Sequence, residues 1–343
     1  MSPAEKDHVH AFRVATGLFF PGIAVLLSGR YELLVYAVFG SFAGMYGRAE
    51  PHRLRLGHQA QAAAILVTSV STGVLLSELR APAWAFVAVA VCCAALLSWV
   101  TDSLDLRPAG PFFGMFALGT TATIPAGHVP PVLAIATCAG TALFCLLISG
   151  IGAAKSTGGG VSAGRQRPCA FDLMIHSIRY ASAIAIAGAC GLLLGTEHAN
   201  WAMVSAVVPL AVIDKANLLD PGIHDVVHRG IHRVLGTLAG LVATALLLAP
   251  APGGAALAAL VIVLLFPTEL FMMRHYGLAL GFFTPLIMLM TQLAEPSDPL
   301  TMLTDRGIDT LIGVAAGIAM AVLIRRPQRL SWRVRSRSTR FRV

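Results

Sequence analysis

Three histidines and two arginines share one stretch of the chain, HDVVHRGIHRVLGTLAG, at residues 224–240. The histidines recur at every fourth residue, at His224, His228 and His232. This spacing places them on one face of a helix, where histidines can bind zinc. An arginine follows His228, however, and no nearby cysteine or glutamate completes a set of ligands. We therefore predict no metal site, and we predict no cofactor and no catalytic residue elsewhere.

Arginines at the borders of apolar runs are the stronger candidates for a site. Arg229 and Arg233 lie where the polar residues give way to an apolar run, and burying an arginine in lipid is costly. They either reach back to lipid phosphate or line the mouth of an anion path. Arg13 and Arg179 each lie early in an apolar run, and a ring of arginines attracts anions. Arg53 precedes a third such run and joins the predicted path.

The composition indicates an integral membrane protein. Of the 343 residues, 56% are hydrophobic and 12% are charged, against about 25% charged in soluble domains. The mean hydropathy is +0.75. We predict an all-α polytopic fold with about twelve membrane-spanning helices of about 20 residues each. The expected spans are 12–28, 32–47, 58–77, 82–100, 111–125, 130–152, 176–195, 200–213, 231–249, 255–273, 276–293 and 305–324.

The basic residues predict the orientation, because Lys and Arg near span ends favour the cytoplasm. With the N-terminus inside, all 25 basic residues except Arg30, Arg80 and Arg306 fall on the cytoplasmic side. Both termini are then cytoplasmic, and we expect a multi-pass protein of the inner or plasma membrane. The basic tail at 326–343 is expected to contact anionic lipids and not nucleic acid.

Two halves of the chain resemble each other. AFRVATG at 11–17 opens the first half, 1–152, and SIRYASA at 177–183 opens the second half, 172–325. Between them, 153–171 is a basic, Gly/Ser-rich cytoplasmic linker. Six spans per half give both halves one orientation, so we expect a pseudo-twofold axis along the membrane normal. A substrate path on this axis is the prediction.

A shorter repeat lies within the second half. RGIHRVLGTLAG at 229–240 and RGIDTLIGVAAG at 306–317 share six identities in register. The two copies open spans of opposite orientation, which predicts an inverted three-helix repeat with Arg229 at the inner face and Arg306 at the outer face. Both copies contain a GxxxG spacing, for which helix packing is the expected role.

Two spans interrupted by Gly and Pro predict the binding site, as in many transporters. They are 111–125, with Phe112 and Phe113, and 276–291, with the residues Phe282, Phe283 and Thr284. Aromatic rings with a few polar groups suit an aromatic carboxylate, although such rings also fill cores or face lipid. Glu269 either carries a coupling proton or pairs with Arg274.

The second half also resembles a known family. Trp201 lies early in one span, Arg229, Arg233 and "GT..G" open the next, and "R..DT.IG" from Arg306 opens the last. This pattern resembles the fusaric-acid-resistance-like (FUSC) or aromatic acid exporter family, and distantly the plant aluminium-activated malate transporters, best over 172–325. The resemblance implies export of aromatic or other organic anions along a path lined by basic residues.

Three other functions stay open. A passive anion channel of the same architecture would differ in ion coupling. A membrane-embedded enzyme would need a nucleophile–base pair or a metal site, and the sequence contains no convincing one. A non-transport scaffold for envelope assembly would show no flux. The substrate, the direction, the coupling ion and the oligomeric state do not follow from the sequence.

Overall fold

The computed structural model describes residues 3–48, 50–151, 169–195, 199–212, 222–272 and 274–325. Over these residues the chain is helical and contains no strand, which confirms the predicted all-α class. The helices are α1 (Pro3–Ser28), α2 (Leu34–Ser41), α3 (His52–Glu78), α4 (Ala83–Ser103), α5 (Phe112–Thr123), α6 (Pro131–Ile151), α7 (Ala170–Leu194), α8 (Ala199–Leu210), α9 (Ile223–Leu248), α10 (Gly254–Met272), α11 (Tyr276–Ala294) and α12 (Pro299–Leu323). Short 3₁₀ turns, η1 (Tyr31–Leu33) and η2 (Phe42–Met45), flank α2. The predicted basic tail and most of the linker lie outside the described residues.

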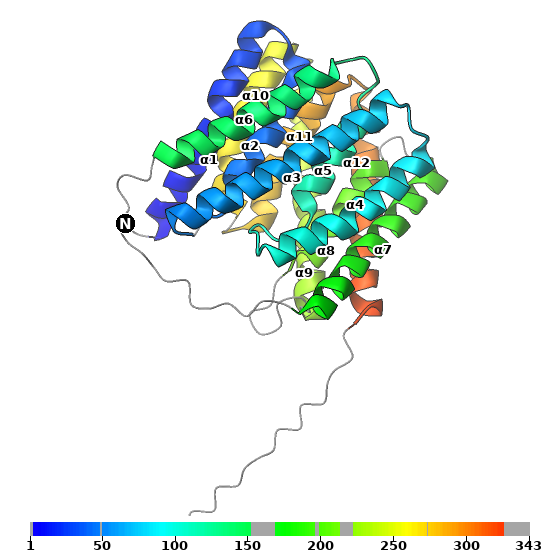
Figure 1. The fold of residues 1–343 in the computed structure, drawn as a ribbon. Coiled ribbons are helices and arrows are strands. Elements are labelled where there is room, and N and C mark those ends of the chain that lie inside the picture. Colours follow the sequence, from blue (N-terminus) through cyan, green and yellow to red (C-terminus); the bar gives the residue numbers. More distant parts are fainter. Residues whose placement is uncertain are drawn as a thin grey trace, which may run out of the picture.

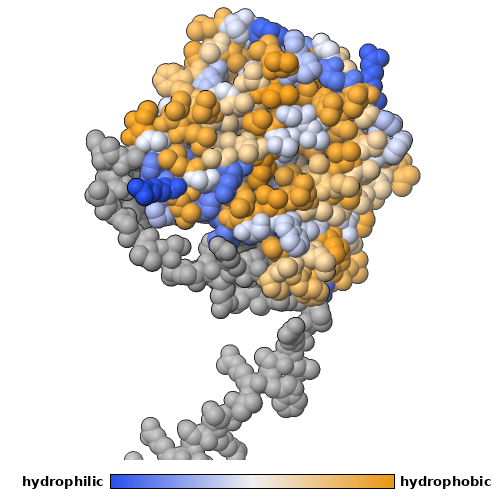
Figure 2. Space-filling model, viewed as in Figure 1, coloured by the Kyte–Doolittle hydropathy of each residue, from blue (hydrophilic) through white to orange (hydrophobic). Residues whose placement is uncertain are grey.

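Nine of these helices are long and apolar enough to cross a membrane. The segment Tyr31–Met45 and the helices α5 and α8 are shorter. At 1.5 Å per residue, the 12 residues of α5 or α8 reach about 18 Å, against a hydrocarbon core of about 30 Å. The expected twelve helices are present among the described residues, and these three are shorter than the predicted length of about 20 residues. The protein is a multi-pass membrane protein, and apolar residues dominate the visible face between hydrophilic patches (Figure 2).

The short helices form the interior of the molecule. Every residue of α2 and α8 is buried, and so are most residues of α5 and α11. A helix that is apolar on all sides is stable only when other helices surround it. The longer helices provide this cover and expose apolar side chains such as Ile151 and Leu193 on the outside.

The helix packing of one half recurs in the other. Helix α2 packs on α6 as α8 packs on α12, and α3 packs on α5 as α9 packs on α11. Two helices cross between the halves, because α4 packs against α7 and α10 packs against α1 (Figure 1). Helix α1 begins and α12 ends on the same, lower side of the helical body in this view.

Glycines set the closest helix contacts, as the GxxxG spacings predicted. A Cβ atom at Gly313 or Gly317 of α12 would overlap the backbone of α8. A Cβ atom at Gly236 or Gly240 of α9 would meet the backbone of α11. The second half contains two three-helix units, α7–α9 and α10–α12. The last helix of each unit packs closely on the middle helix of the other unit, α9 on α11 and α12 on α8.

Candidate functional site

A cavity of about 1030 Å³ lies where helices of both halves meet. Its wall comes from the start of α1, the turn after η2, the start of α3, the loop between α4 and α5, the start of α5, the end of α8, and α9, α10 and α11. Four arginines line it, namely Arg48, Arg107, Arg229 and Arg233. The aromatic side chains on its wall are Phe112, Phe113, Tyr276 and Phe283. The cavity thus combines positive charge with aromatic surface.

Arg233 is the innermost cation of this cavity. It lies on α9 and is only 1% exposed, with its guanidinium 5.5 Å from the ring centroid of Phe112. Its Nε and Nη2 atoms have no hydrogen-bond partner among the described residues, and its remaining polar contact is with Tyr276. Burying a charged donor without a partner is costly, so such groups are rare unless a ligand uses them. The arrangement suits a carboxylate that accepts from Arg233.

Arg229 lies one turn nearer the start of α9, at the rim of the cavity. Its guanidinium lies 3.7 Å from the ring centroid of Tyr276, which is the geometry of a cation–π contact. His228 and His232 flank it on the wall, with their rings 4.2 Å apart. In the part of the chain that the structure describes, no group of three side chains could hold a metal ion.

The inverted repeat predicted Arg306 at the outer face, but the structure places this side chain in the interior. It is 1% exposed, its guanidinium lies 4.1 Å from the ring of Trp201, and its charge interacts with Arg233 and Asp309. Arg306 is the eighth residue of α12 and Arg233 the eleventh of α9, so each lies about 10–15 Å from its helix start. Helices that enter from opposite sides bring such positions together near the middle. Arg306 is not part of the cavity wall, and the buried Asp309 offsets part of its charge.

An interlocked aromatic cluster closes the inner end of the cavity. Phe112 and Phe113 of α5 face the cavity and lie within 6.3 Å, centroid to centroid, of further rings. Phe116 lies behind them and contacts Trp201 of α8 and Phe283 of α11 at 6.1 Å each. The phenylalanine pairs predicted on α5 and α11 therefore meet in this cluster, with the exception of Phe282.

Two predicted residues of α11 lie elsewhere. Phe282 stacks on Phe271 of α10 with ring centroids 5.8 Å apart. Thr284 is buried against Gly240 of α9, where it forms part of the helix contact. Neither is part of the cavity wall, because consecutive residues of a helix point about 100° apart.

The arginines predicted at the entrance also lie outside the cavity wall. An Nη2 atom of Arg13 donates to Nδ1 of His10 at 2.7 Å, and Nε of Arg179 donates to the carbonyl of Ile324 at 2.6 Å. Arg53 is exposed on α3. Arg48 and Arg107 occupy the wall instead, and the sequence placed both on the same side without showing that they converge.

We expect Arg179→Gln to lower stability without changing anion affinity. Arg179 is 3% exposed and holds the end of α12 through a charge-assisted hydrogen bond of about 1.5–3 kcal/mol. The thermal midpoint of purified protein should fall, while the KM for anion transport should stay within about twofold. A rise in KM with an unchanged midpoint would instead place Arg179 on the path.

Glu269 of α10 lies on the cavity wall and is 3% exposed. Its Oε2 lies 3.7 Å from Nε2 of His10, and Arg48 donates to its backbone carbonyl at 3.4 Å. The alternative partner considered from the sequence, Arg274, is exposed. Glu269 is therefore a buried carboxylate on the same cavity wall as the four arginines.

The helices and this cavity define a class: multi-pass, all-helical membrane proteins with an internal polar cavity. Residues 184–320 match the model of the fusaric acid resistance protein-like family. This match confirms the family resemblance over most of the second half of the chain. Neither the curated proteins nor the solved structures gave a match. The distant likeness to malate transporters stays a prediction.

Proposed function

We propose that this protein is a transporter that exports organic anions, in particular aromatic carboxylates, through the arginine-lined cavity. The observation that carries the proposal is Arg233, a fully buried cation with unused N–H donors at the inner end of the cavity. The family match supports a membrane transporter of the resistance type.

The lining favours an aromatic carboxylate over a small inorganic anion. Arg229 and Arg233 supply donors for the carboxylate, and Phe112, Phe113 and Tyr276 supply apolar surface for a ring. A volume of about 1030 Å³ accommodates an organic acid with its hydration water.

The repeated helix packing supports a path between the two halves. The cavity takes residues from both halves, and its aromatic floor comes from the corresponding helices α5 and α11. We propose that these helices lie about a pseudo-twofold axis and that the cavity opens to the cytoplasm. The positive-inside rule supports this orientation, with both termini cytoplasmic in the inner or plasma membrane. We further propose that the tail at 326–343 contacts anionic lipids.

The experiment is flux of labelled benzoate in proteoliposomes, with the pH gradient and the membrane potential set independently. Uphill benzoate movement driven by either gradient is the expected result. Absence of movement for benzoate and for other organic anions tested would contradict the proposal and favour a scaffold.

A passive channel is the second candidate, and the same experiment separates it. A channel would pass benzoate only down its electrochemical gradient. The aromatic cluster that closes the inner end of the cavity favours a transporter, because a channel needs a continuous open path.

A further inference from the structure

Two buried histidine–carboxylate pairs occupy corresponding positions in the two halves. His10 and Arg13 of α1 have the same spacing as His176 and Arg179 of α7. His10 faces Glu269 near the end of α10, and His176 faces a carboxylate near the end of α4. Because α4 packs on α7 as α10 packs on α1, each pair joins one half to the other.

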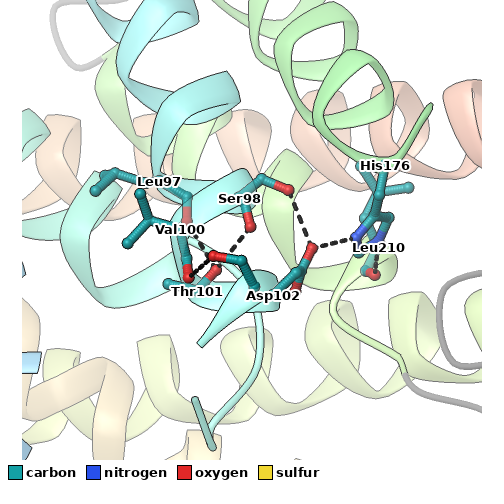
Figure 3. A network of polar contacts seen from close by, with 8 residues as sticks. Leu97, Ser98, Val100, Thr101, Asp102, His176 and Leu210 are labelled. Atoms are coloured by element: carbon teal, nitrogen blue, oxygen red, sulfur yellow. Dashed lines mark hydrogen bonds and ion pairs between the residues drawn. The ribbon is translucent and has the colours of Figure 1, made fainter. Parts of the chain in front are cut away.

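The second pair consists of Asp102 and His176. Oδ2 of Asp102 lies 2.7 Å from Nδ1 of His176, and both side chains are 5% exposed. The other ring nitrogen, Nε2, lies 3.3 Å from the backbone carbonyl of Leu210, where α8 ends (Figure 3). Ser98 donates to the same carboxylate oxygen at 3.3 Å.

The geometry of this pair requires a bound proton. Both ring nitrogens of His176 face oxygen atoms, and an ionised carboxylate or a carbonyl only accepts hydrogen bonds. A neutral imidazole has a single N–H. Holding both contacts therefore takes one proton more than a neutral histidine and an ionised Asp102 contain. One hydrogen then lies between Nδ1 and Oδ2, and a second lies on Nε2 toward the carbonyl of Leu210.

The corresponding pair differs in this respect. Arg13 can only donate, so Nδ1 of His10 accepts and Nε2 carries the one hydrogen of a neutral ring. Nε2 lies 3.7 Å from Glu269, too far for a hydrogen bond. This pair thus contains no shared proton, and both of its members lie on the cavity wall.

We propose that Asp102 and His176 form a proton-binding site whose occupancy couples proton movement to anion transport. With the proton, the pair is neutral overall and ties α4, α7 and the end of α8 together. Release of one proton to water leaves a net charge of −1. The neutral ring keeps its single N–H on the carboxylate of Asp102, because that bond is charge-assisted, and Nε2 then faces the carbonyl of Leu210 as a lone pair. The end of α8, where Val208 and Ala211 line the cavity, is then no longer held by His176, with no change in any bond between heavy atoms.

Few other charges lie near this pair among the described residues. Asp105 follows Asp102 by three residues, and its carboxylate pairs with Arg107 at 2.6 Å. Tyr180 lies one turn further along α7, with its ring 4.8 Å from that of His176, and it interacts electrostatically with Arg179 and Arg229. Asp172 lies one turn before His176 on the same helix. Helices α5 and α8 and the second half of α12, Gly313–Leu323, contain no ionisable side chain. Proton occupancy therefore changes the charge at this contact between halves directly.

The inference rests on the proposed function, so its test uses two separable readouts. The first is benzoate transport in proteoliposomes by Asp102→Asn, Asp102→Glu and His176→Gln, with Glu78→Gln as the control. Glu78 is exposed at the C-terminal end of α3, and its carboxylate accepts a hydrogen bond from the backbone N–H of Gly127. Asp102→Asn should keep flux down a benzoate gradient within about twofold of wild type and lose accumulation driven by a pH gradient at least tenfold. Asp102→Glu should recover part of the accumulation driven by the pH gradient.

Accumulation by Asp102→Asn at the wild-type level would overturn the proposal. If that variant does not fold, His176→Gln and Asp102→Glu give the same comparison. The second readout is ¹⁵N NMR of labelled histidine, in which the His176 signals are those lost in His176→Gln. Protons on both ring nitrogens at pH 7 in wild type, and on Nε2 alone in Asp102→Asn, support the site even if benzoate transport fails. An unprotonated Nδ1 in wild type would overturn it.

Discussion

Replacing Arg233 with glutamine should reduce benzoate flux about 30-fold or more. Losing one buried charge contact to an anion costs about 2–5 kcal/mol, and each 1.4 kcal/mol is a factor of ten. Arg233 is the innermost cavity cation, with Nε and Nη2 free of partners in the described part of the chain. Arg233→Lys keeps the charge without the planar donors, and its benzoate flux should lie between those of wild type and Arg233→Gln. The measurement is initial flux at several benzoate concentrations.

The same variant should fold at least as stably as wild type. An unpaired buried cation costs desolvation energy, and its removal returns that energy. The thermal midpoint of Arg233→Gln in detergent should therefore equal or exceed that of wild type, while function is lost. Arg30→Gln, at a half-exposed arginine paired with Glu32 away from the cavity, is the control and should keep wild-type flux. Loss of flux together with unfolding would instead make Arg233 a structural residue.

Gly313→Ala should lower the free energy of unfolding by about 1–3 kcal/mol, the usual cost of an added group in a tightly packed site. A Cβ atom at Gly313 would overlap the carbonyl oxygen of Ala202 and crowd Ser205. These are backbone and Cβ atoms of α8, which cannot rotate away, so α8 and α12 must separate. Thermal unfolding followed by circular dichroism measures the effect.

Gly140→Ala is the matched control for this prediction. Gly140 lies inside α6, and a Cβ atom there would meet nothing within 4 Å. Alanine favours the helix by up to about 1 kcal/mol, so this variant should be as stable as wild type or more so. Equal midpoints for the two alanine variants would show that α8 and α12 do not pack as closely as described.

Local patterns predicted most of the helices and part of the site. The apolar runs predicted all twelve helices, and the GxxxG spacing predicted that Gly313 packs against another helix, which the structure shows to be α8. Arg229 and Arg233 lie on one face of α9 and enter the same cavity, as their spacing indicated. Phe112 of α5 meets Phe283 of α11 there, because the rings of both helices reach into the interior.

The rest depends on contacts between distant segments. Arg48 and Arg107 reach the cavity from loops, where no periodicity fixes the direction of a side chain. Asp102 and His176 are 74 residues apart and meet only because α4 crosses to the other half. The short length of α8 was hidden, because an apolar run does not show where its helix stops within the interior.

Binding of labelled benzoate to the purified protein shows directly whether Arg233 holds the anion. The measurement compares wild type, Arg233→Gln and Arg30→Gln by equilibrium dialysis in detergent. We expect saturable binding to wild type and Arg30→Gln, and a loss of about 30-fold or more in affinity for Arg233→Gln. Equal binding by all three proteins would contradict it, since Arg233 would then not hold the anion.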